Sequence, residues 1–303
     1  MRHGDAQVSV LASVAALLAS FAAIGPAASE QACPAVTHVA RALAPGEVVV
    51  LTAACSTPLD GVEATAFGKT IPFVEAGNPG TWQALAGIDL GTAPGKYTVN
   101  VTARAGASSF TGTHRVTVAA RQFRTRRLTL AKEFVTPPAS ARARIEQEAK
   151  RVGALMSAVT PGRLWRAPVL QPVPGPMISP FGTQSILNGT PGSRHGGADF
   201  RGAEGTPILA PAAGRIVLTG DLYFSGQTVI IDHGLGLVSL LAHLSQIRVR
   251  EGDTVARGEE VGAVGSTGRV TGPHLHWTVR LLGARVDPMS LLAVLGQAGT
   301  QMP

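Results

Sequence analysis

Two histidines near the end of the chain, His274 and His276, have a spacing that suits metal binding or acid/base catalysis. They belong to the run GPHLHW at residues 272–277, which continues into apolar and β-branched residues typical of a strand. Side chains at positions i and i+2 of a β-strand point to the same face of the sheet. Both imidazoles would therefore reach one point in space, which a helix does not arrange at this spacing.

Two further stretches carry residues of the same kind. His195 and Asp199 lie in the run RHGGADF at 194–200, where the two intervening glycines predict a turn that leads into a strand. His243 lies in the run LAHLS at 241–245, which is also apolar and strand-like. Three separate clusters on predicted strands indicate one metal site built from distant segments.

The residue types in these clusters predict metal-dependent hydrolysis. A catalytic zinc site uses three protein ligands and keeps one position open, and His195, Asp199 and His276 meet that count. We expect one zinc ion per chain there, where it would lower the pKa of a bound water and polarise a substrate carbonyl. His243 and His274 remain for proton transfer and oxyanion stabilisation, because the chain has no His-Glu-x-x-His motif to supply a glutamate base.

Three other histidines are expected to have no chemical role. His233 stands in a DHG run after an apolar stretch, where a strand-end turn with a structural hydrogen bond is expected. His38 and His114 are isolated in the sequence. Isolated histidines are more often surface or packing residues than ligands.

The clusters lie in a region that reads as a mainly β structure. From Trp165 onward the chain consists of short strand-like runs and Gly-Pro turns, which predict a compact antiparallel β-domain with a groove over residues 165–295. Strands are expected within 207–218, 228–234, 238–244 and 259–264.

The preceding region is predicted to form a second domain and a connection. Short alternating runs over 36–135 predict an immunoglobulin-like β-sandwich, with turns at Gly68-Lys69 and before Tyr97. Residues 139–158 are rich in Ala, Arg, Glu and Lys, which predicts a helix capped by Ser140 and ended by Pro161-Gly162. We expect this helix to be part of a linker over 136–164.

The charge pattern excludes little but argues against one class of partner. The chain of 303 residues has a formal net charge of +7, and such a balance attracts polyanions. No nucleic-acid signature accompanies it, so no nucleic-acid partner is expected. The densest basic run, made of Arg121, Arg124, Arg126 and Arg127, is interpreted as a surface property that favours an anionic cell envelope.

The N-terminal residues predict export. Residues 1–29 combine a short basic start, an apolar run over 8–24 and small residues over 26–29, which is the pattern of a secretory signal peptide. A single membrane anchor is the alternative, because the run is near the lower limit of a spanning length. After cleavage no stable membrane span is expected, and the protein would lie in the periplasm or cell envelope, or outside the cell. Cys33 and Cys55, the two cysteines of the chain, would form a disulfide there.

The region from about Gly175 to Leu292 resembles the lysostaphin/LytM-type zinc metallopeptidases. The resemblance is carried by SPFG at 179–182, HGGAD at 195–199, GTPILA at 205–210, AHLS at 242–245, VGAVGSTG at 261–268 and TGPHLH at 271–276. It implies that the zinc ligands match His195, Asp199 and His276 and that the catalytic histidines match His243 and His274. It also implies hydrolysis of peptidoglycan cross-links outside the cytoplasmic membrane, in a β-sheet groove lined by loops. The N-terminal β-domain resembles the accessory domain of some exported members.

Three positions depart from that family or bear on its regulation. Leu241 stands where many members carry Tyr, and it is expected to face away from the metal. Trp277 replaces a commoner Phe, a change of size that we interpret as packing. In some relatives an upstream Asn blocks the zinc, but Asn188 precedes Gly189 in a pair that also makes a good hairpin turn, and the turn is favoured.

Three functions are consistent with the sequence. The leading hypothesis is an exported zinc endopeptidase that cleaves stem peptides or cross-links of peptidoglycan. The second is a non-catalytic regulator that activates a cell-wall amidase, a role that some relatives reach by losing metal ligands, whereas this chain retains all five positions. The third is a secreted peptidase that acts on soluble proteins. The sequence identifies no regulatory protein partner.

Overall fold

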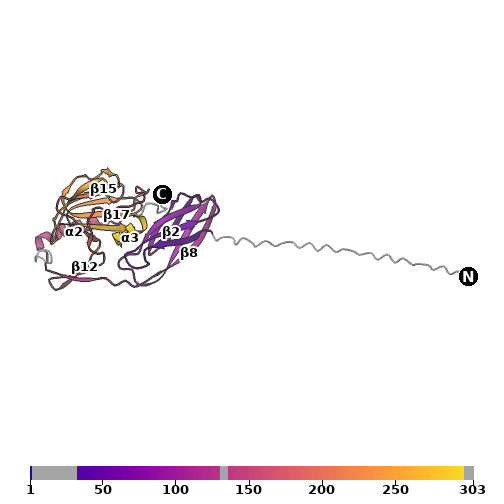
Figure 1. Cartoon of the computed structure of the whole chain (residues 1–303), viewed down its shortest axis with the longest axis horizontal. Coiled ribbons are helices and arrows are strands. Elements are labelled where there is room, and N and C mark those ends of the chain that lie inside the picture. Colours follow the sequence, from indigo (N-terminus) through magenta and orange to yellow (C-terminus); the bar gives the residue numbers. More distant parts are fainter. Residues whose placement is uncertain (2–32, 130–135, 297–303) are drawn as a thin grey trace. The chain divides into compact units, whose positions relative to one another are not determined.

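The computed structural model of the chain describes Met1 and residues 33–129 and 136–296. The predicted signal peptide at 1–29 lies, apart from Met1, outside the described residues. Among the described residues, no helix combines the length and the apolar character needed to cross a membrane. The structure is mainly β, as the sequence predicts (Figure 1).

Two four-stranded sheets form the N-terminal β-sandwich. Their orders are β1-β2-β6-β5 and β4-β3-β7-β8. Alternate residues of β7, such as Val99 and Val101, are buried while their neighbours are exposed, so one face of this sheet packs on the core. The bounds are β1 (Ala35–Ala40), β2 (Val48–Ala54), β3 (Gly61–Ala66), β4 (Lys69–Pro72), β5 (Val74–Glu75), β6 (Thr81–Gly87), β7 (Gly95–Ala105) and β8 (Ser108–Val118). The immunoglobulin-like topology stays a prediction.

The turn between β3 and β4 lies one residue before the predicted Gly68-Lys69, because Lys69 is the first residue of β4, whereas the predicted disulfide is present. Phe67 and Gly68, both with positive φ, form the turn between β3 and β4, a conformation that glycine adopts without steric cost. Cys33 and Cys55 form a disulfide across a separation of 22 residues, which confirms the predicted pairing.

A ten-stranded sheet forms the C-terminal region, and all its strand pairs are antiparallel, as predicted. Its main order is β10-β13-β20-β17-β16-β15-β18, and β14, β19 and β21 pair beside this path. Leu241 and Trp277 are register partners on the central strands and are fully buried. The bounds are β10 (Met177–Ser179), β13 (Ala198–Arg201), β14 (Pro207–Leu209), β15 (Gly214–Leu222), β16 (Gly226–Asp232), β17 (Leu237–Ile247), β18 (Thr254–Val255), β19 (Glu260–Val264), β20 (His274–Leu281) and β21 (Ala284–Val286).

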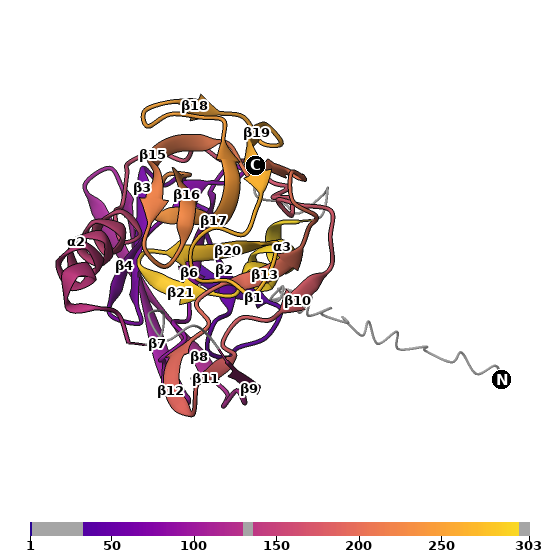
Figure 2. The same ribbon diagram turned by 90° about the vertical axis from the view of Figure 1, so that its left-hand side faces the viewer.

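A three-stranded sheet combines segments that are far apart in the sequence. Strands β11 (Gln184–Leu187) and β12 (Thr190–Arg194) form a hairpin whose turn is Asn188-Gly189, with both residues at positive φ. The predicted turn is therefore confirmed. Strand β9 (Thr125–Leu128) pairs with β11 in parallel, and Figure 2 shows β9, β11 and β12 together.

Helix α2 (Ala139–Leu155) is where predicted, but its ends differ from the prediction. Pro138 in an extended conformation is the N-cap residue, without a side-chain hydrogen bond, so the assignment of Ser140 as the cap is wrong. The Pro138 carbonyl accepts a hydrogen bond from the Ala141 N–H at 3.0 Å, so the first helical turn starts there and Ser140 lies inside it. The helix ends before Met156, which packs with Leu218 and Ile230 of the ten-stranded sheet.

The N-cap residue of helix α3 (Pro288–Leu295) is Asp287, whose side chain accepts a hydrogen bond from the Met289 backbone N–H. The same carboxylate accepts hydrogen bonds from Arg41 at 2.7 Å and Arg121 at 3.1 Å. Both guanidiniums also bind the buried Glu47. Arg121 is thus part of an ion-pair network between the sandwich side and α3, and the interpretation of the basic run as a surface property is wrong for this residue.

A second ion pair joins the segment after β6 to strand β21 of the ten-stranded sheet. Arg285 on β21 donates to Asp89 through its backbone N–H and its guanidinium, at 2.7–3.1 Å. Burial opposes ionisation of Asp89, but these hydrogen bonds outweigh it and lower the pKa of Asp89 to about 2.

Candidate metal centre

Two adjacent strands bring the predicted ligands together. Strands β13 and β20 pair so that Asp199 lies directly opposite His276, and opposed residues on one sheet face are close neighbours. His195 lies in the turn before β13. Gly197 is required in this turn, since a Cβ there would collide with the Trp277 carbonyl oxygen and Thr278.

The three side chains converge on one point. His195 Nε2 lies 2.9 Å from Asp199 Oδ1, and His276 Nδ1 lies 2.8 Å from the same oxygen. The two imidazole nitrogens are 3.0 Å apart. Ligand atoms bonded to a tetrahedral zinc ion at about 2.0–2.1 Å are about 3.3 Å from one another, so this donor set fits a zinc ion. Among the described residues, this is the group of three or more His, Cys, Asp or Glu that could hold a metal.

The opposite nitrogens of both imidazoles have fixed partners. His195 Nδ1 lies 3.1 Å from the Pro180 carbonyl oxygen, and a carbonyl only accepts, so Nδ1 donates and Nε2 keeps its lone pair. His276 Nε2 lies 2.8 Å from Thr278 Oγ1. Such hydrogen bonds orient metal-binding imidazoles and fix their tautomer.

His243 reaches the cleft from a break in strand β17. The pairing of β16 with β17 shifts register between Gln227 and Val229, opposite Leu244 and Leu241, which leaves an extra residue at this point of β17. His243 takes a φ of 68° there, a left-handed conformation that is uncommon for residues other than glycine. Such a bulge re-aims a side chain, and here it directs the imidazole of His243 into the cleft.

Both predicted catalytic histidines have one nitrogen tied to a backbone carbonyl. His243 Nδ1 donates to Thr267 O at 2.9 Å, and His274 Nδ1 donates to Gly272 O at 2.8 Å. Each Nε2 is therefore the nitrogen that can accept a proton. The ring centroids of His243 and His274 are 5.0 Å apart, and His274 Nε2 lies 3.9 Å from Asp199 Oδ1. Both imidazoles thus lie beside the three-residue cluster.

Burial and mutual contacts shift the pKa values of this site. Burial alone would raise the pKa of Asp199, but hydrogen bonds from His195 and His276 hold it well below its usual range. Burial lowers the pKa of His276 despite the opposing effect of Asp199. Burial, with the neighbouring His276 and His274, lowers the pKa of His243 to about 3. Neutral imidazoles beside an ionised carboxylate are the state that binds a divalent cation.

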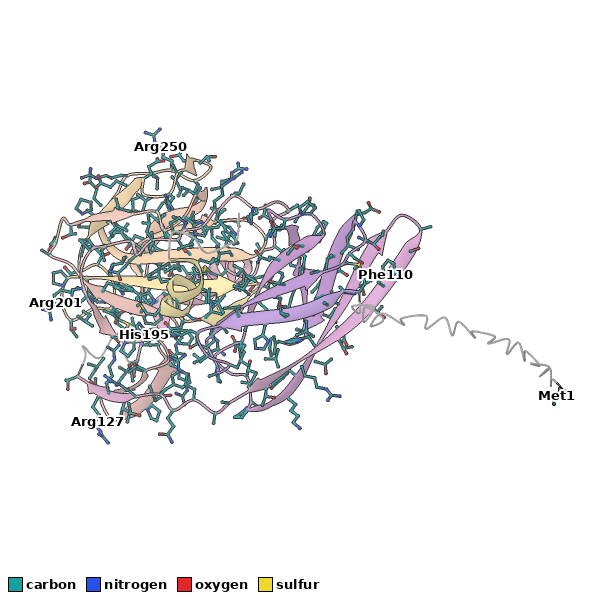
Figure 3. All side chains as sticks on the ribbon, turned by 45° about the vertical axis from the view of Figure 1, so that its right-hand side comes forward. Met1, Phe110, Arg127, His195, Arg201 and Arg250 are labelled. Atoms are coloured by element: carbon teal, nitrogen blue, oxygen red, sulfur yellow. A yellow bond between two sulfur atoms is a disulfide. The ribbon has the colours of Figure 1, made fainter. Side chains whose placement is uncertain are left out.

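The site opens into a cleft of about 500 Å³. Strand β10, the β11–β12 hairpin and the segments around Phe224 and Arg269 line it, and all five predicted site residues contribute to its wall. Figure 3 labels His195 and also Arg127, which lies on strand β9. The predicted groove is therefore present. Part of its wall comes from Arg126 and Leu128 of strand β9, a segment that the sequence assigned to the accessory domain.

Three histidines outside the cleft, His233, His38 and His114, are expected from the sequence to have no chemical role. His233 is buried between the Ala213 carbonyl oxygen and Ser239 Oγ, at 2.9 and 3.0 Å, which confirms its structural role. His38 and His114 are isolated in sequence, but in space the Nδ1 of one lies 2.7 Å from the Nε2 of the other.

Arg126 is a residue of the site that the sequence did not predict. Its guanidinium lies 4.0 Å from Asp199 Oδ2 and donates to Ser179 and Ser185, so its interpretation as a surface charge is wrong. The alternation of β9 could have indicated that Arg126 faces inward, but nothing local shows that β9 pairs beside the cleft.

Comparison with known proteins agrees with this geometry. Residues 193–288 match the sequence profile of peptidase family M23. A solved structure from Pseudomonas aeruginosa, described as a peptidase M23, is 36% identical with a TM-score of 0.65, and the match covers 82% of this chain and 95% of that one. The chain belongs to peptidase family M23, whose members are zinc-dependent metallopeptidases.

Curated relatives match over a shorter segment. The peptidoglycan DD-endopeptidase ShyA of Vibrio cholerae is 41% identical over 95 residues, which are 31% of this chain and 22% of ShyA. The DD-carboxypeptidase/endopeptidase Mpg of Neisseria meningitidis is 45% identical over 97 residues, which are 32% of this chain and 22% of Mpg. The chain thus spans about a fifth of the length of the curated relatives it matches.

Proposed function

We propose that the chain is an exported zinc-dependent endopeptidase that hydrolyses stem peptides or cross-links of peptidoglycan. The observation that carries this proposal is the convergence of His195, Asp199 and His276 beside His243 and His274 in an open cleft. The names of ShyA and Mpg support the choice of substrate. The retention of all five positions argues against a non-catalytic regulator of an amidase.

Each residue has a proposed role. His195, Asp199 and His276 hold one zinc ion per chain, which when bound would activate a water ligand and polarise the scissile carbonyl. His243 and His274 each present Nε2 to the cleft, because a backbone carbonyl holds Nδ1. One of them accepts the proton of the attacking water, and the other donates to the oxyanion or to the departing amine.

We further propose the arrangement of the whole chain. Residues 1–29 would direct export to the periplasm or cell envelope, and 36–135 would form the accessory β-domain, of which strand β9 pairs with β11 beside the cleft. Residues 136–164 would connect it to the peptidase domain of 165–295. The disulfide between Cys33 and Cys55 supports an oxidising compartment.

The experiment measures zinc content and product release together. The purified chain and its His195→Ala variant are incubated with intact sacculi, and soluble muropeptides are analysed by mass spectrometry. We expect near-stoichiometric zinc and new muropeptides from the unaltered chain alone. Digestion of casein but not of sacculi would favour the secreted-peptidase alternative, and no zinc with no product would favour the regulator.

A further inference from the structure

The cleft is strongly cationic. Arg126, Arg194 and Arg269 are among the residues that line it, and Asp199 is the carboxylate among its described lining residues. That carboxylate is already engaged by two imidazoles, and a bound divalent cation would add positive charge. A cleft lined by one sign of charge raises the local concentration of substrates of the opposite sign. The cleft therefore favours a peptide that carries negative charge near the bond to be cleaved.

The guanidinium of Arg126 lies close to one of the proposed metal ligands, Asp199. Its Nη1 lies 4.0 Å from Asp199 Oδ2, whereas Asp199 Oδ1 faces the two histidines. Successive residues of a peptide are about 3.8 Å apart. With a scissile carbonyl at the ligand cluster, a carboxylate on a flanking residue would thus fall within reach of Arg126.

Side-chain contacts hold Arg126 in place. Its Nε donates to Ser185 Oγ at 3.1 Å and its Nη1 donates to Ser179 Oγ at 2.9 Å. Both serines are buried, while 36% of the Arg126 side chain is exposed. The guanidinium is therefore fixed through Nε and Nη1 while part of the side chain is exposed at the cleft, which lowers the entropic cost of binding an anion.

The backbone of the Arg126 segment is fixed as well. The Arg124 and Leu128 carbonyls accept hydrogen bonds from the Gln184 and Asn188 N–H groups at 2.8 and 3.0 Å. The ring of Phe123 packs against Gly182, where any side chain would collide with it. The position of Arg126 is therefore a built feature of the cleft wall.

We propose that the cleft selects peptides with a free carboxylate on a residue that flanks the scissile bond, and that Arg126 binds this carboxylate. This inference rests on the proposed function for the identity of the scissile bond. A planar guanidinium matches a carboxylate with two parallel N–H···O bonds. Peptides whose flanking carboxylate is amidated lose this pairing and expose the guanidinium to an N–H donor.

Binding and hydrolysis are measured separately to test this inference. Two fluorescein-labelled peptides ending in D-Ala-D-Ala are used, one with a free C-terminal carboxylate and one as the carboxamide. Fluorescence anisotropy on the zinc-loaded full chain gives the ratio of the two Kd values. We expect the free carboxylate to bind roughly ten- to a hundred-fold more tightly, the usual range for a hydrogen bond to a charged group.

Three variants test whether Arg126 is the residue that binds the carboxylate. Arg126→Gln should bring the two Kd values within about two-fold of each other at unchanged zinc content, and Arg126→Lys should keep part of the preference because it keeps the charge. The matched control is Arg127→Gln, since Arg127 is the exposed neighbour on the same strand, and it should keep the full preference.

Several results would overturn the inference. They are equal or absent binding of both peptides to the unaltered chain, an unchanged ratio in Arg126→Gln, and tighter binding of both peptides to Arg126→Gln, which would mean that Arg126 obstructs the cleft. Hydrolysis of cross-linked muropeptides is followed in parallel. Carboxylate-dependent binding without hydrolysis would contradict the proposed function and support the inference. Hydrolysis that does not depend on the carboxylate would support the proposed function and contradict the inference.

Discussion

Replacement of Glu47 by Gln should destabilise the protein through the ion-pair network at helix α3. The Glu47 side chain is 3% exposed. Its carboxylate accepts hydrogen bonds from Arg41 at 2.6 and 3.1 Å, from Arg121 at 3.0 Å and from Ser290 at 2.7 Å. With Asp287 the cluster holds two cations and two anions, so the neutral glutamine leaves one guanidinium charge uncompensated.

The expected loss in the free energy of unfolding follows from how deeply the ion pairs of Glu47 are buried. Removal of one partner from a fully buried ion pair costs about 3–5 kcal/mol. Arg41 and Arg121 are 34% and 25% exposed, so water can solvate part of their charge, and both still bind Asp287. We therefore expect a loss of about 2–3 kcal/mol in the free energy of unfolding, which lowers the Tm by roughly 5 °C for a protein of this size.

The assay compares Glu47→Gln with Glu63→Gln in urea and thermal unfolding followed by circular dichroism. Glu63 is an exposed glutamate on strand β3, so its replacement removes the same charge without breaking a buried network. A double variant, Glu47→Gln with Arg121→Gln, should recover part of the loss because it removes the uncompensated cation. Tm values of Glu47→Gln and Glu63→Gln within about 1 °C would refute the reasoning.

Three further variants or conditions test other parts of the structure. His274→Ala should keep zinc but lose most turnover, and unchanged hydrolysis would show that this imidazole does not move protons. Burial lowers the pKa of His233 to about 4, below the value of about 6.5 in the unfolded chain. The unfolded state therefore binds more protons as the pH falls from about 6.5 to 4, and stability should drop by up to about 3 kcal/mol. His233→Gln should lack this component in urea titrations at pH 7 and pH 5, and an equal pH slope in both proteins would contradict it. Reduction of the disulfide between Cys33 and Cys55, which closes a 22-residue separation, should cost about 3 kcal/mol; unchanged urea midpoints with and without reductant would argue otherwise.

Much of the fold was predictable because its signals are local. Strand alternation placed His274 and His276 on one strand, and the Asn188-Gly189 pair specified its hairpin turn. Glycines before Asp199 predicted the turn that brings His195 to the same point. These features depend on a few neighbouring residues, so spacing alone is informative.

The features that could not be predicted depend on pairing between distant segments. A strand-like run around His243 gives no sign of the extra residue that turns its imidazole into the cleft. Strand β9 is short and basic, and only its partner β11 makes it part of the site. The role of Arg126 follows from this pairing. The ion pairs of Arg121 and the contact of His38 with His114 depend on packing between other distant segments.

The parallel pairing of β9 with β11 also determines how this peptidase can be divided. The stretch that matches the family begins at residue 193, downstream of Arg126, Ser179 and Ser185. A fragment cut at that boundary, or a chimera that imports only that fragment, would carry the proposed metal ligands without part of the cleft wall. A transferable unit has to start before Phe123, so it is longer than the segment that matches the family profile.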